Sequence, residues 1–338
     1  MPPEKPIQVD YIVVGLGIAG IAITEVLLQQ GKKVLVFSNP ELPQATRVSG
    51  GIINPLVLKH LRPVWQVETL LPKAINFYKA LLEKLKIAEG LDVPIYRIFS
   101  SVEDQNNWVV SSDKPNTQAY LGAIHQDDLT KSIHTPFCVG EVQQAIRVPA
   151  QKIVTQYANT LLEKGCLIQE TFNWECLKKE KTNTTTLQYK QFKARYIVSC
   201  EGPGILQNPF YKAEWILPKK GEYLIIHAPQ LQTKAIWKGT YFILPQEAGY
   251  YKIGATFIHN DLSTAASNTG KQALLDFCER VLQVPFKVVH YQVGFRPTTK
   301  DRRPLLGWLS AQWHIAMFNG LGARGWLAAP TIAEALVA

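Results

Sequence analysis

Three glycines near the start of the chain have the spacing of a loop that binds nucleotide phosphates. Gly15, Gly17 and Gly20 fit the pattern Gly-x-Gly-x-x-Gly, in which they permit a tight turn, let the backbone approach a pyrophosphate and let helix and strand pack closely. A helix that begins here, around Ile18 and Ala19, offers free N–H groups and a partial positive charge to the phosphates. The spacing predicts a dinucleotide site, and a purely structural turn is the weaker alternative.

The elements around this loop are those that such a site needs. An apolar strand over 12–14 precedes the loop, a helix over 21–30 follows it, and a second buried strand is expected over 33–37. Together they form one β-α-β unit of about 30 residues. The second strand ends at Ser38 and Asn39, where an acidic residue usually accepts the ribose hydroxyls, so we expect a weaker, uncharged contact from these two.

The periodicity of the rest of the chain predicts helices, strands and one long polar loop. Strand-like runs lie between 187 and 256 and again at 287–293, and the polar loop spans 103–116. Amphipathic or apolar helices are predicted over 66–85, 154–164, 270–282 and 331–337.

Composition and charge indicate a folded protein of about two domains. The chain has 338 residues, of which 46% are hydrophobic and 19% charged, and this composition excludes predominant disorder. Its formal net charge is +9. Because the basic residues are scattered, that charge permits an anionic partner without identifying one.

The cysteines, histidines and the first apolar run exclude several classes of protein. Five widely spaced cysteines argue against a disulfide framework or a zinc site, and they favour a reducing compartment. Seven dispersed histidines indicate no metal site and no hydrolytic triad. The run over 11–24 is broken by three glycines, so we expect neither a signal peptide nor a membrane span, and a cytoplasmic location.

Four later segments indicate which dinucleotide the site would hold. They are Thr-Arg-Val-Ser-Gly-Gly-Ile-Ile-Asn-Pro at 46–55, a strand that ends in glycine at 194–202, a strand pair at 241–256 and a glycine-rich run at 294–330. Their order and content resemble those of the glycine oxidase / D-amino-acid oxidase family of FAD enzymes. The resemblance extends from Asp10 to Leu336 and implies FAD, bound non-covalently, as the cofactor.

Within that family, one motif is most similar to a particular branch. Gly-Leu-Gly-Ala-Arg-Gly at 320–325, followed by Ala-Pro at 329–330, resembles the FAD oxidase domain of the bifunctional enzyme that modifies the tRNA wobble uridine. A tRNA partner therefore stays open beside a small amine or amino-acid substrate.

The resemblance implies a mixed α/β fold with two interleaved domains. One is a Rossmann-like FAD-binding domain, expected over 1–62, 140–210 and 292–338. The other is a substrate-binding domain with a mostly antiparallel β-sheet, expected over 63–139 and 211–291.

The resemblance also implies which residues hold FAD. The turn that opens the last helix would direct backbone N–H dipoles at the negative charge of reduced flavin, and helix packing is its alternative role. Arg47 would neutralise flavin or phosphate charge or merely occupy a loop, and Cys200 is expected to pack rather than to anchor flavin. Beyond the glycine loop, the candidates are Ser38, Asn39, Arg47, Ser49, Gly50, Gly51, Ile52, Trp174, Cys200, Gly202, Gly322, Ala323, Arg324, Gly325 and Trp326.

Three further residues are candidates for substrate chemistry. In the resembling oxidases the arginine of a Gly-Phe-Arg-Pro segment, here Arg296, grips the substrate carboxylate through two parallel hydrogen bonds, and a structural arginine is the alternative. Tyr241 would hydrogen-bond a carboxylate or amine, or simply pack on its strand. Lys252 lies where the resembling sarcosine oxidases place a lysine that speeds reaction with oxygen, and a solvent-facing lysine is its alternative.

The expected activity is oxidation of the C–N bond of an amino-acid-like or N-carboxymethyl amine by hydride transfer to flavin N5. No general base is obvious, which suits transfer from a neutral amine. Two alternatives remain. One is a tRNA carboxymethylaminomethyl-uridine oxidase in which Arg296 would hold the carboxymethyl group, and the other is a non-catalytic flavin-binding redox sensor. A nicotinamide dehydrogenase is disfavoured by the segments after Ser38.

Overall fold

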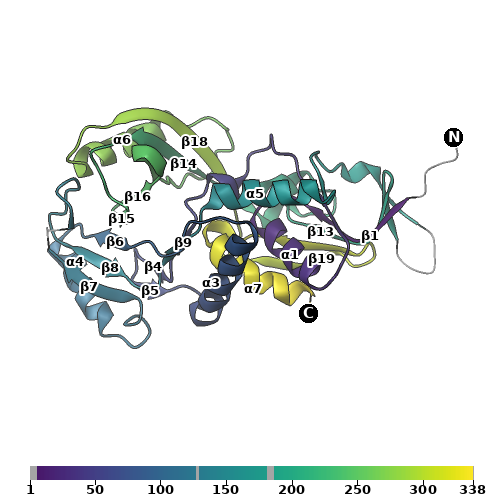
Figure 1. Cartoon of the computed structure of the whole chain (residues 1–338), viewed down its shortest axis with the longest axis horizontal. Helices are drawn as coiled ribbons and strands as arrows, with labels where there is room; N and C mark the ends of the chain where they lie inside the picture. Colours follow the sequence, from purple (N-terminus) through teal and green to yellow (C-terminus); the bar gives the residue numbers. More distant parts are fainter. Residues whose placement is uncertain (1–5, 127–128, 181–185, 338) are drawn as a thin grey trace.

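Two eight-stranded β-sheets form the frame of the protein and lie next to each other along its long axis (Figure 1). The computed structural model describes residues 6–126, 129–180 and 186–337. Each sheet takes strands from several separate parts of the chain, so the chain passes between the sheets more than once. The expected mixed α/β fold with interleaved units is confirmed.

The first sheet has a parallel centre, as the predicted β-α-β unit requires. β1 (Ile7–Val14) pairs in parallel with β2 (Val34–Phe37) on one side and with β13 (Phe192–Ser199) on the other. β10 (Leu167–Ile168) and β20 (Ile315–Asn319) extend this parallel set. The antiparallel strands of the sheet are β11 (Leu177–Lys179), β12 (Leu187–Tyr189) and β19 (Leu305–Ser310).

Four helices gather on one side of this sheet (Figure 1). They confirm the helices predicted around the glycine loop and at 66–85, 154–164 and 331–337, although the last two begin earlier than predicted. These helices are α1 (Ile18–Gln29), α3 (Val67–Lys84), α5 (Ala150–Glu163) and α7 (Gly325–Val337).

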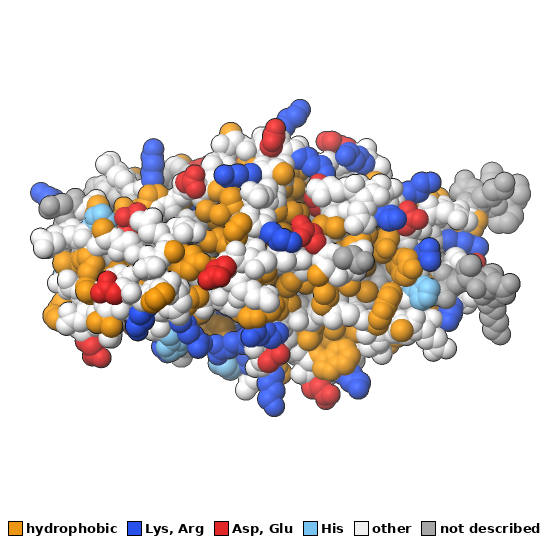
Figure 2. Space-filling model, turned by 90° about the horizontal axis from the view of Figure 1, so that it is seen from below, with side chains coloured by type: hydrophobic (Ala, Val, Ile, Leu, Met, Phe, Trp, Pro, Cys, Tyr) orange, Lys and Arg blue, Asp and Glu red, His pale blue; other side chains and the backbone are white. Residues whose placement is uncertain are grey.

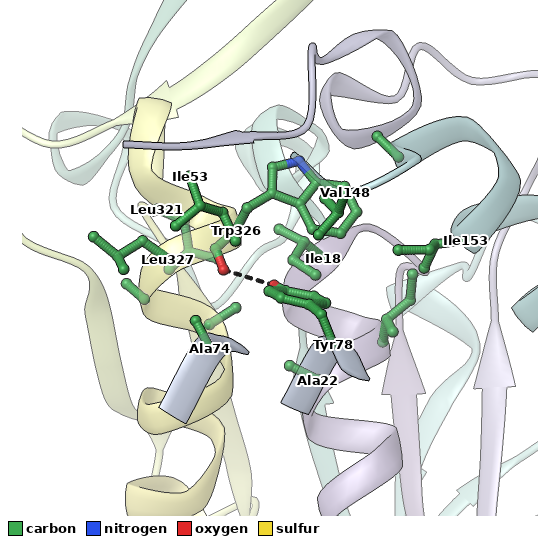
Figure 3. Close-up of a cluster of buried hydrophobic side chains, with 14 of the residues drawn as sticks. Ile18, Ala22, Ile53, Ala74, Tyr78, Val148, Ile153, Leu321, Trp326 and Leu327 are labelled. Atoms are coloured by element: carbon green, nitrogen blue, oxygen red, sulfur yellow. Dashed lines mark hydrogen bonds between the residues drawn. The ribbon is translucent and has the colours of Figure 1, made fainter. Parts of the chain in front are cut away.

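A buried cluster joins the starts of α1 and α7 to the middle of α3 (Figure 3). The Tyr78 hydroxyl donates a hydrogen bond to the main-chain oxygen of Trp326 at 2.7 Å, and Tyr78 is fully buried. Ile18 and Val148 pack in the same cluster. The two helix N-termini are therefore fixed relative to each other by packing that a shift of either helix would disrupt.

Aromatic side chains cover the opposite face of the first sheet. Phe37, at the end of β2, makes edge contacts with Phe172, Tyr189 and Phe192, with ring centroids 5.1–5.9 Å apart. Trp174 packs against Phe172 in this cluster. The central parts of the parallel strands are therefore buried on both faces, which explains the apolar runs at 12–14, 34–37 and 315–318.

The second sheet is antiparallel except for one pair. Only β15 and β6 run parallel among its paired strands in the described residues. The order across the sheet is β18 (Lys287–Thr298), β14 (Leu217–His227), β17 (Tyr250–Gly254), β16 (Phe242–Pro245), β15 (Ile236–Lys238), β6 (Ile95–Ile98), β8 (Val139–Val142) and β7 (Leu121–His125).

Helix α6 (Asn268–Val281) covers one face of the second sheet. Its Leu274 and Phe277 are buried against Leu224 and Ile226 of β14 and Ile253 of β17. Because neighbouring strand residues point to opposite faces, the alternate residues of these strands face the other way.

Short elements connect the two sheets. α2 (Ala45–Val48) follows the first β-α-β unit, and β3 (Ile52–Ile53) pairs antiparallel with β9 (Ile146–Arg147). β4 (Leu56–Val57) and β5 (Arg62–Pro63) form a small separate pair.

One predicted loop is a helix in the structure. The polar stretch over 103–116 contains α4 (Val102–Ser112), so the loop prediction was wrong. The Ser101 hydroxyl accepts a hydrogen bond from the Asp104 amide and caps the helix. Trp108 is buried against Gly140 of β8, where an added Cβ would meet the indole at 2.5 Å. The Trp108 side chain thus anchors a helix that has little apolar periodicity.

The domain limits stay a proposal, and two of them fall inside strands of the second sheet. The limit at 140 lies in β8 and the limit at 292 lies in β18. α3, expected with the substrate domain, packs on α1 and α7 through the cluster of Figure 3. We propose that both strands belong wholly to the second sheet and that α3 belongs with the first.

A fully buried ion pair fastens the segment 256–267 to the second sheet. The Lys220 ammonium lies 3.3 Å from the Glu222 carboxylate, and both side chains are inaccessible to solvent. Lys220 also donates to Asp261 and to the Ala265 main-chain oxygen, each at 2.7 Å. Glu222 accepts from the Ser267 amide at 2.7 Å, at the start of α6. Every charge of the pair is therefore compensated, which burial demands.

Replacement of Lys220 tests this fastening. Lys220→Met should lower the free energy of unfolding by about 3–5 kcal/mol, because it leaves the Glu222 carboxylate buried without its cation. Adding Glu222→Gln should recover part of the loss. Urea denaturation followed by tryptophan fluorescence measures both effects, with Lys287→Met on the exposed edge of β18 as the control. Equal denaturation midpoints for wild type and Lys220→Met would contradict the assigned role.

Candidate functional site

A cavity of about 920 Å³ is lined by residues of both sheets. From the first sheet it receives the glycine loop after β1 and the residues that follow β2, β10 and β13. From the second sheet it receives residues of β14, β16, β17, β15 and β18. The cavity thus lies at the carboxyl ends of the parallel strands, where open α/β sheets place their ligands.

The glycine loop lies in the cavity wall at the N-terminus of α1. Gly15, Gly17, Ile18 and Ala19 line the cavity, while Gly20 lies behind them. An added Cβ on Gly20 would lie 1.9 Å from the Gly15 carbonyl oxygen. Only glycine permits this approach of helix and loop, which is the packing role expected of the third glycine.

A side chain from α2 caps α1, and the sequence analysis did not single it out. The Thr46 hydroxyl accepts a hydrogen bond from the Ile18 amide at 2.9 Å, and Thr46 is buried. Thr46 comes 28 residues after Ile18, so no local pattern marks it as a cap.

Ser38 and Asn39 line the cavity after β2, as expected for ribose contacts. The Asn39 amide donates to the Thr171 hydroxyl at 3.0 Å, and its carbonyl accepts from the Glu41 amide at 2.9 Å. Asn39 is therefore held in one orientation.

A half-buried carboxylate lies at the same end of the cavity. Glu201 accepts hydrogen bonds from the Trp174 indole at 3.0 Å, the Ser199 hydroxyl at 2.6 Å and Asn208 at 2.9 Å. Burial raises the pKa of Glu201, and these three donors oppose that shift. Trp174 is thereby oriented by its indole N–H rather than by packing alone.

Cys200 and Gly202 flank Glu201 and line the cavity. Cys200 is buried, and burial raises the pKa of its thiol well above the ordinary value. A thiol with a raised pKa is a poor nucleophile, in agreement with the packing role expected of this residue. The Gly202 carbonyl accepts from Asn319 of β20 at 2.9 Å.

The segment 46–52 crosses between the two sheets and contributes Ser49, Gly50, Gly51 and Ile52 to the lining. The Gly51 backbone has φ +69°, and an added Cβ would lie 2.0 Å from the Val148 carbonyl oxygen. Arg47 is absent from the lining residues in the described structure, and its buried Nε has no hydrogen-bond partner there. The role of Arg47 beside flavin or phosphate stays a prediction.

The turn that opens α7 faces this segment. Gly322, Ala323, Arg324, Gly325 and Trp326 all line the cavity. Three of them form a short 3₁₀ turn that runs directly into the helix, as the sequence predicts.

Two side chains of this turn form hydrogen bonds with the stretch 46–55, which includes the crossing segment. The Trp326 indole donates to the Ser49 hydroxyl at 2.8 Å, and Arg324 donates to the Asn54 carbonyl at 3.2 Å. Burial lowers the pKa of Arg324 to about 10. Trp326 also closes the cluster of Figure 3, so one residue connects the cavity with the helix core.

Arg296 reaches the cavity from β18, as predicted. Its guanidinium donates to the Thr256 carbonyl at 3.2 Å and interacts with the Tyr223 hydroxyl. Gly221 makes room for it, since an added Cβ there would lie 2.6 Å from both terminal nitrogens. Burial raises the pKa of Tyr223, and the Arg296 cation opposes that shift. Both side chains are only partly buried, so the cationic group remains accessible from the cavity.

Lys252 is buried, so the solvent-facing alternative was wrong. Its ammonium donates to the Val48 carbonyl at 2.8 Å and lies 4.8 Å from the centre of the Tyr223 ring. Burial and the neighbouring Arg147 lower the pKa of Lys252 to about 8. Lys252 is absent from the lining residues in the described structure, so its role toward oxygen stays a prediction.

Tyr241 lies away from the cavity. Its ring packs edge-on against Phe277 of α6, with centroids 5.5 Å apart. The adjacent Phe242 lines the cavity instead. A substrate contact by Tyr241 therefore has no support from its placement.

Lys238 is a cavity residue that the sequence analysis missed. It lies at the end of β15, and its ammonium donates to the main-chain oxygens of Gly239 and Thr240 at 2.6 and 2.7 Å. Burial and the nearby Arg97 lower the pKa of Lys238 to about 8. A single lysine in a short strand carries no sequence signal that separates it from a surface residue.

The described part of the chain has neither a metal-binding cluster nor a helix suited to a membrane. It contains no group of three or more His, Cys, Asp and Glu side chains arranged to hold a metal ion. None of its helices combines the length and the hydropathy needed to cross a membrane.

Comparisons with known proteins identify relatives along nearly the whole chain. Residues 10–338 match the family model described as FAD dependent oxidoreductase. Glycine oxidase of Bacillus subtilis (strain 168) is 22% identical over 344 residues, which cover 95% of this chain and 90% of that protein.

Solved structures of two oxidases have the same fold. Glycine oxidase from Bacillus cereus ATCC 14579 has a TM-score of 0.79 at 17% identity, with 97% of this chain and 93% of that chain covered. Iminodiacetate oxidase from Chelativorans sp. BNC1 has a TM-score of 0.75 at 17% identity, with 96% and 94% covered. The family match runs through the glycine loop, the crossing segment and the last helix alike, and the chain belongs to the family of FAD-dependent oxidoreductases that includes glycine oxidase.

Proposed function

We propose that this enzyme binds FAD non-covalently and oxidises the C–N bond of an amino-acid-like or N-carboxymethyl amine. The position of Arg296 is the observation that supports this proposal most directly. Its guanidinium lines the same cavity as the glycine loop, and its hydrogen bonds within the described residues go to main-chain carbonyls and Tyr223. A guanidinium with these neighbours is available to a substrate carboxylate, which it matches in charge and shape.

The residues of the cavity fit FAD. A volume of about 920 Å³ lies at the upper end of the range for small-molecule and cofactor sites. One end has the helix N-terminus that suits a pyrophosphate, and the glycines at 15 and 51 let two lining segments pack closely against the main chain of Cys200 and Val148. The raised pKa of the Cys200 thiol supports non-covalent binding. Flavin released into the supernatant by acid precipitation would test that point.

Each end of the cavity would hold a different part of the cofactor. Gly17 and the α1 N-terminus would bind the pyrophosphate, and Ser38 and Asn39 the ribose. The segment 50–52 and the turn 322–326 would enclose the flavin ring, where backbone N–H groups stabilise negative charge. When bound, FAD supplies a two-electron acceptor for the hydride that leaves the carbon next to the substrate nitrogen.

Arg296 would orient the substrate by its carboxylate. The lining residues from the second sheet include no carboxylate and no imidazole in the described residues, so no such base is present to remove a proton from an ammonium group. A neutral amine is therefore the reactive form in this proposal. Anaerobic bleaching of the flavin by a panel of amines and amino acids tests it, and a yellow protein that no amine bleaches would indicate a redox sensor instead.

A tRNA substrate is the second candidate, favoured by basic residues beside the cavity. Lys59 lines the cavity and is exposed. Arg62, three residues later, is exposed too. The Arg303 guanidinium lies 4.3 Å from the centre of the Trp65 ring, which brings 300–303 beside 59–65. Figure 2 shows Lys, Arg and His side chains gathered along the lower edge of one face. In this proposal Arg296 would hold the carboxymethyl group of a modified uridine.

A cytoplasmic location remains part of the proposal. All five cysteines are free in the structure, and two of them, Cys200 and Cys278, are buried. Free thiols persist in reducing compartments. Fractionation of cells that express the tagged chain would test the location.

Replacement of Arg296 tests the substrate contact. Arg296→Met should lower kcat/KM for carboxylated amines about ten- to a hundredfold, because a charge-assisted hydrogen bond is worth about 1.5–3 kcal/mol. The variant should retain FAD, and amines without a carboxylate should react at unchanged rates. Steady-state kinetics measure the effect, and Arg280→Met on the exposed side of α6 is the control. Unchanged kinetics for carboxylated amines would remove the assigned role.

Replacement of Gly51 tests the approach of the crossing segment to the flavin. Gly51→Ala places a Cβ against the Val148 carbonyl at a positive φ, so the segment must shift and FAD binding should weaken at least about tenfold. The ratio of flavin to protein absorbance after dialysis measures retention. Gly90→Ala is the control, because its added Cβ has no neighbour within 4 Å. Full retention of FAD by Gly51→Ala would count against the placement.

Salt dependence separates the two substrate classes. Binding of unmodified tRNA should weaken at least about tenfold between 50 and 200 mM salt if several phosphates are contacted. Arg302→Glu with Arg303→Glu should abolish that binding, while Lys32→Glu with Lys33→Glu, which changes the net charge equally, should not. Fluorescence anisotropy of labelled tRNA measures both. If tRNA fails to bind at low salt, or if both double variants weaken it equally, the tRNA candidate is rejected.

A further inference from the structure

We infer that Lys238 is a second anion-binding residue of the substrate site, so that the substrate carries a carboxylate on each side of its amine nitrogen. One carboxylate would bind Arg296 and the other Lys238. The inference rests on the proposed function, because it assumes that an amine occupies the space beside Arg296.

The register of the second sheet places Lys238 on the cavity face. Lys238 pairs with Phe242, Phe242 with Gly254, and Gly254 with Tyr223, in four successive strands. Residues paired in this way project from the same face of a sheet. All four line the cavity, and Tyr223 interacts with Arg296.

This row of four paired residues separates Lys238 from Tyr223, which interacts with Arg296. Three strand spacings of about 4.8 Å place the Lys238 backbone about 14 Å from that of Tyr223. Gly254, which lies between them, has no side chain, and the Tyr223 ring occupies the space where a Cβ would lie. The Phe242 ring lies beside the Lys238 ammonium at 5.0 Å. Lys238 thus lies at one end of this row and the interacting pair Tyr223 and Arg296 at the other, with Phe242 and Gly254 between them.

Lys238 has no acidic partner in the described residues. Its hydrogen bonds go to two main-chain oxygens. Arg97, its neighbour across β6, is a second cation, and Arg97 already pairs with Asp104 at 2.8 Å. A partly buried cation beside another cation is unfavourable until an anion binds. The lowered pKa of Lys238 reflects that environment.

The acidic residues of the cavity lie elsewhere. The three acidic lining residues of the described structure, Glu170, Glu175 and Glu201, follow strands of the first sheet. The second-sheet end is therefore positive, with Arg296 and Lys238 as its charged lining residues. Two separated cations without an intervening acid favour a dianionic ligand over a ligand with one carboxylate.

Two unreactive ligands isolate the contribution of the second carboxylate. Diglycolate has a carboxylate on each side of an ether oxygen, and methoxyacetate replaces one carboxymethyl group with a methyl group. Titration of the FAD-loaded protein, followed by the flavin absorbance change and by calorimetry, gives both dissociation constants without turnover. Wild type should bind diglycolate at least about tenfold more tightly, as expected for one added charge-assisted contact.

Variants assign the preference to Lys238. Lys238→Met should remove the preference for diglycolate and leave both methoxyacetate affinity and FAD content unchanged. Lys238→Arg keeps the charge and should retain most of the preference, which controls for disrupted folding. Lys234→Met, an exposed lysine just before β15, should behave as wild type. Arg296→Met should weaken both ligands.

The outcomes separate the inference from the proposed function. Equal affinity of wild type for the two ligands, or a preference that persists in Lys238→Met, overturns the inference alone. Loss of FAD from Lys238→Met overturns it too, because the lysine would then belong to the cofactor site. If neither ligand binds wild type, or Arg296→Met leaves both affinities unchanged, the carboxylate anchor fails and the proposed function fails with it.

Discussion

The crossing segment 46–52 is bonded to both sheets, and the cavity has its shape because of these bonds. On the first-sheet side, Thr46 accepts from the α1 N-terminus and Ser49 accepts from Trp326. On the second-sheet side, Lys252 donates to the Val48 carbonyl. Val148 donates to the Gly51 carbonyl at 2.9 Å, beside the short β3–β9 pair. Because the crossing segment is held at so many points, it cannot move independently of the two sheets. It therefore forms a fixed boundary between the two ends of the cavity.

This arrangement separates two chemical tasks. The first sheet presents backbone groups and a helix N-terminus, which suit phosphates and need no particular side chains. The second sheet presents long cationic and aromatic side chains from a broad antiparallel surface, where Arg296 and Tyr223 support each other. Binding at the first end depends on glycines, while selectivity at the second end depends on which side chain occupies each position of a strand. The second end can therefore change its ligand without altering the fold that carries the first.

The sequence predicts features whose signals lie within one stretch of the chain, but it predicts poorly those that depend on strand pairing or on contacts between distant segments. The glycine loop with its flanking strands and the periodic helix α3 are recognisable because their signals lie within one stretch. α4 was missed because its support is one buried tryptophan and a serine cap rather than a periodic apolar face. Tyr241 and Phe242 differ by one position, yet they lie on different sides of the strand, so a shift of one residue selects the wrong neighbour. Lys238 joins the site only through strand pairing across β15, β16 and β17, which no local pattern encodes.

The late position of β20 and α7 along the chain has a consequence for biosynthesis. A nascent polypeptide that has emerged as far as residue 300 already contains β1, β2 and β13, but it lacks β20, which pairs with β13 on the side away from β1, and α7, which packs on α3. Until then Tyr78 lacks Trp326, and the apolar edge of the sheet is open to solvent or to other chains. Completion of the cofactor end of the cavity must accordingly wait until residues 315–337 have left the ribosome.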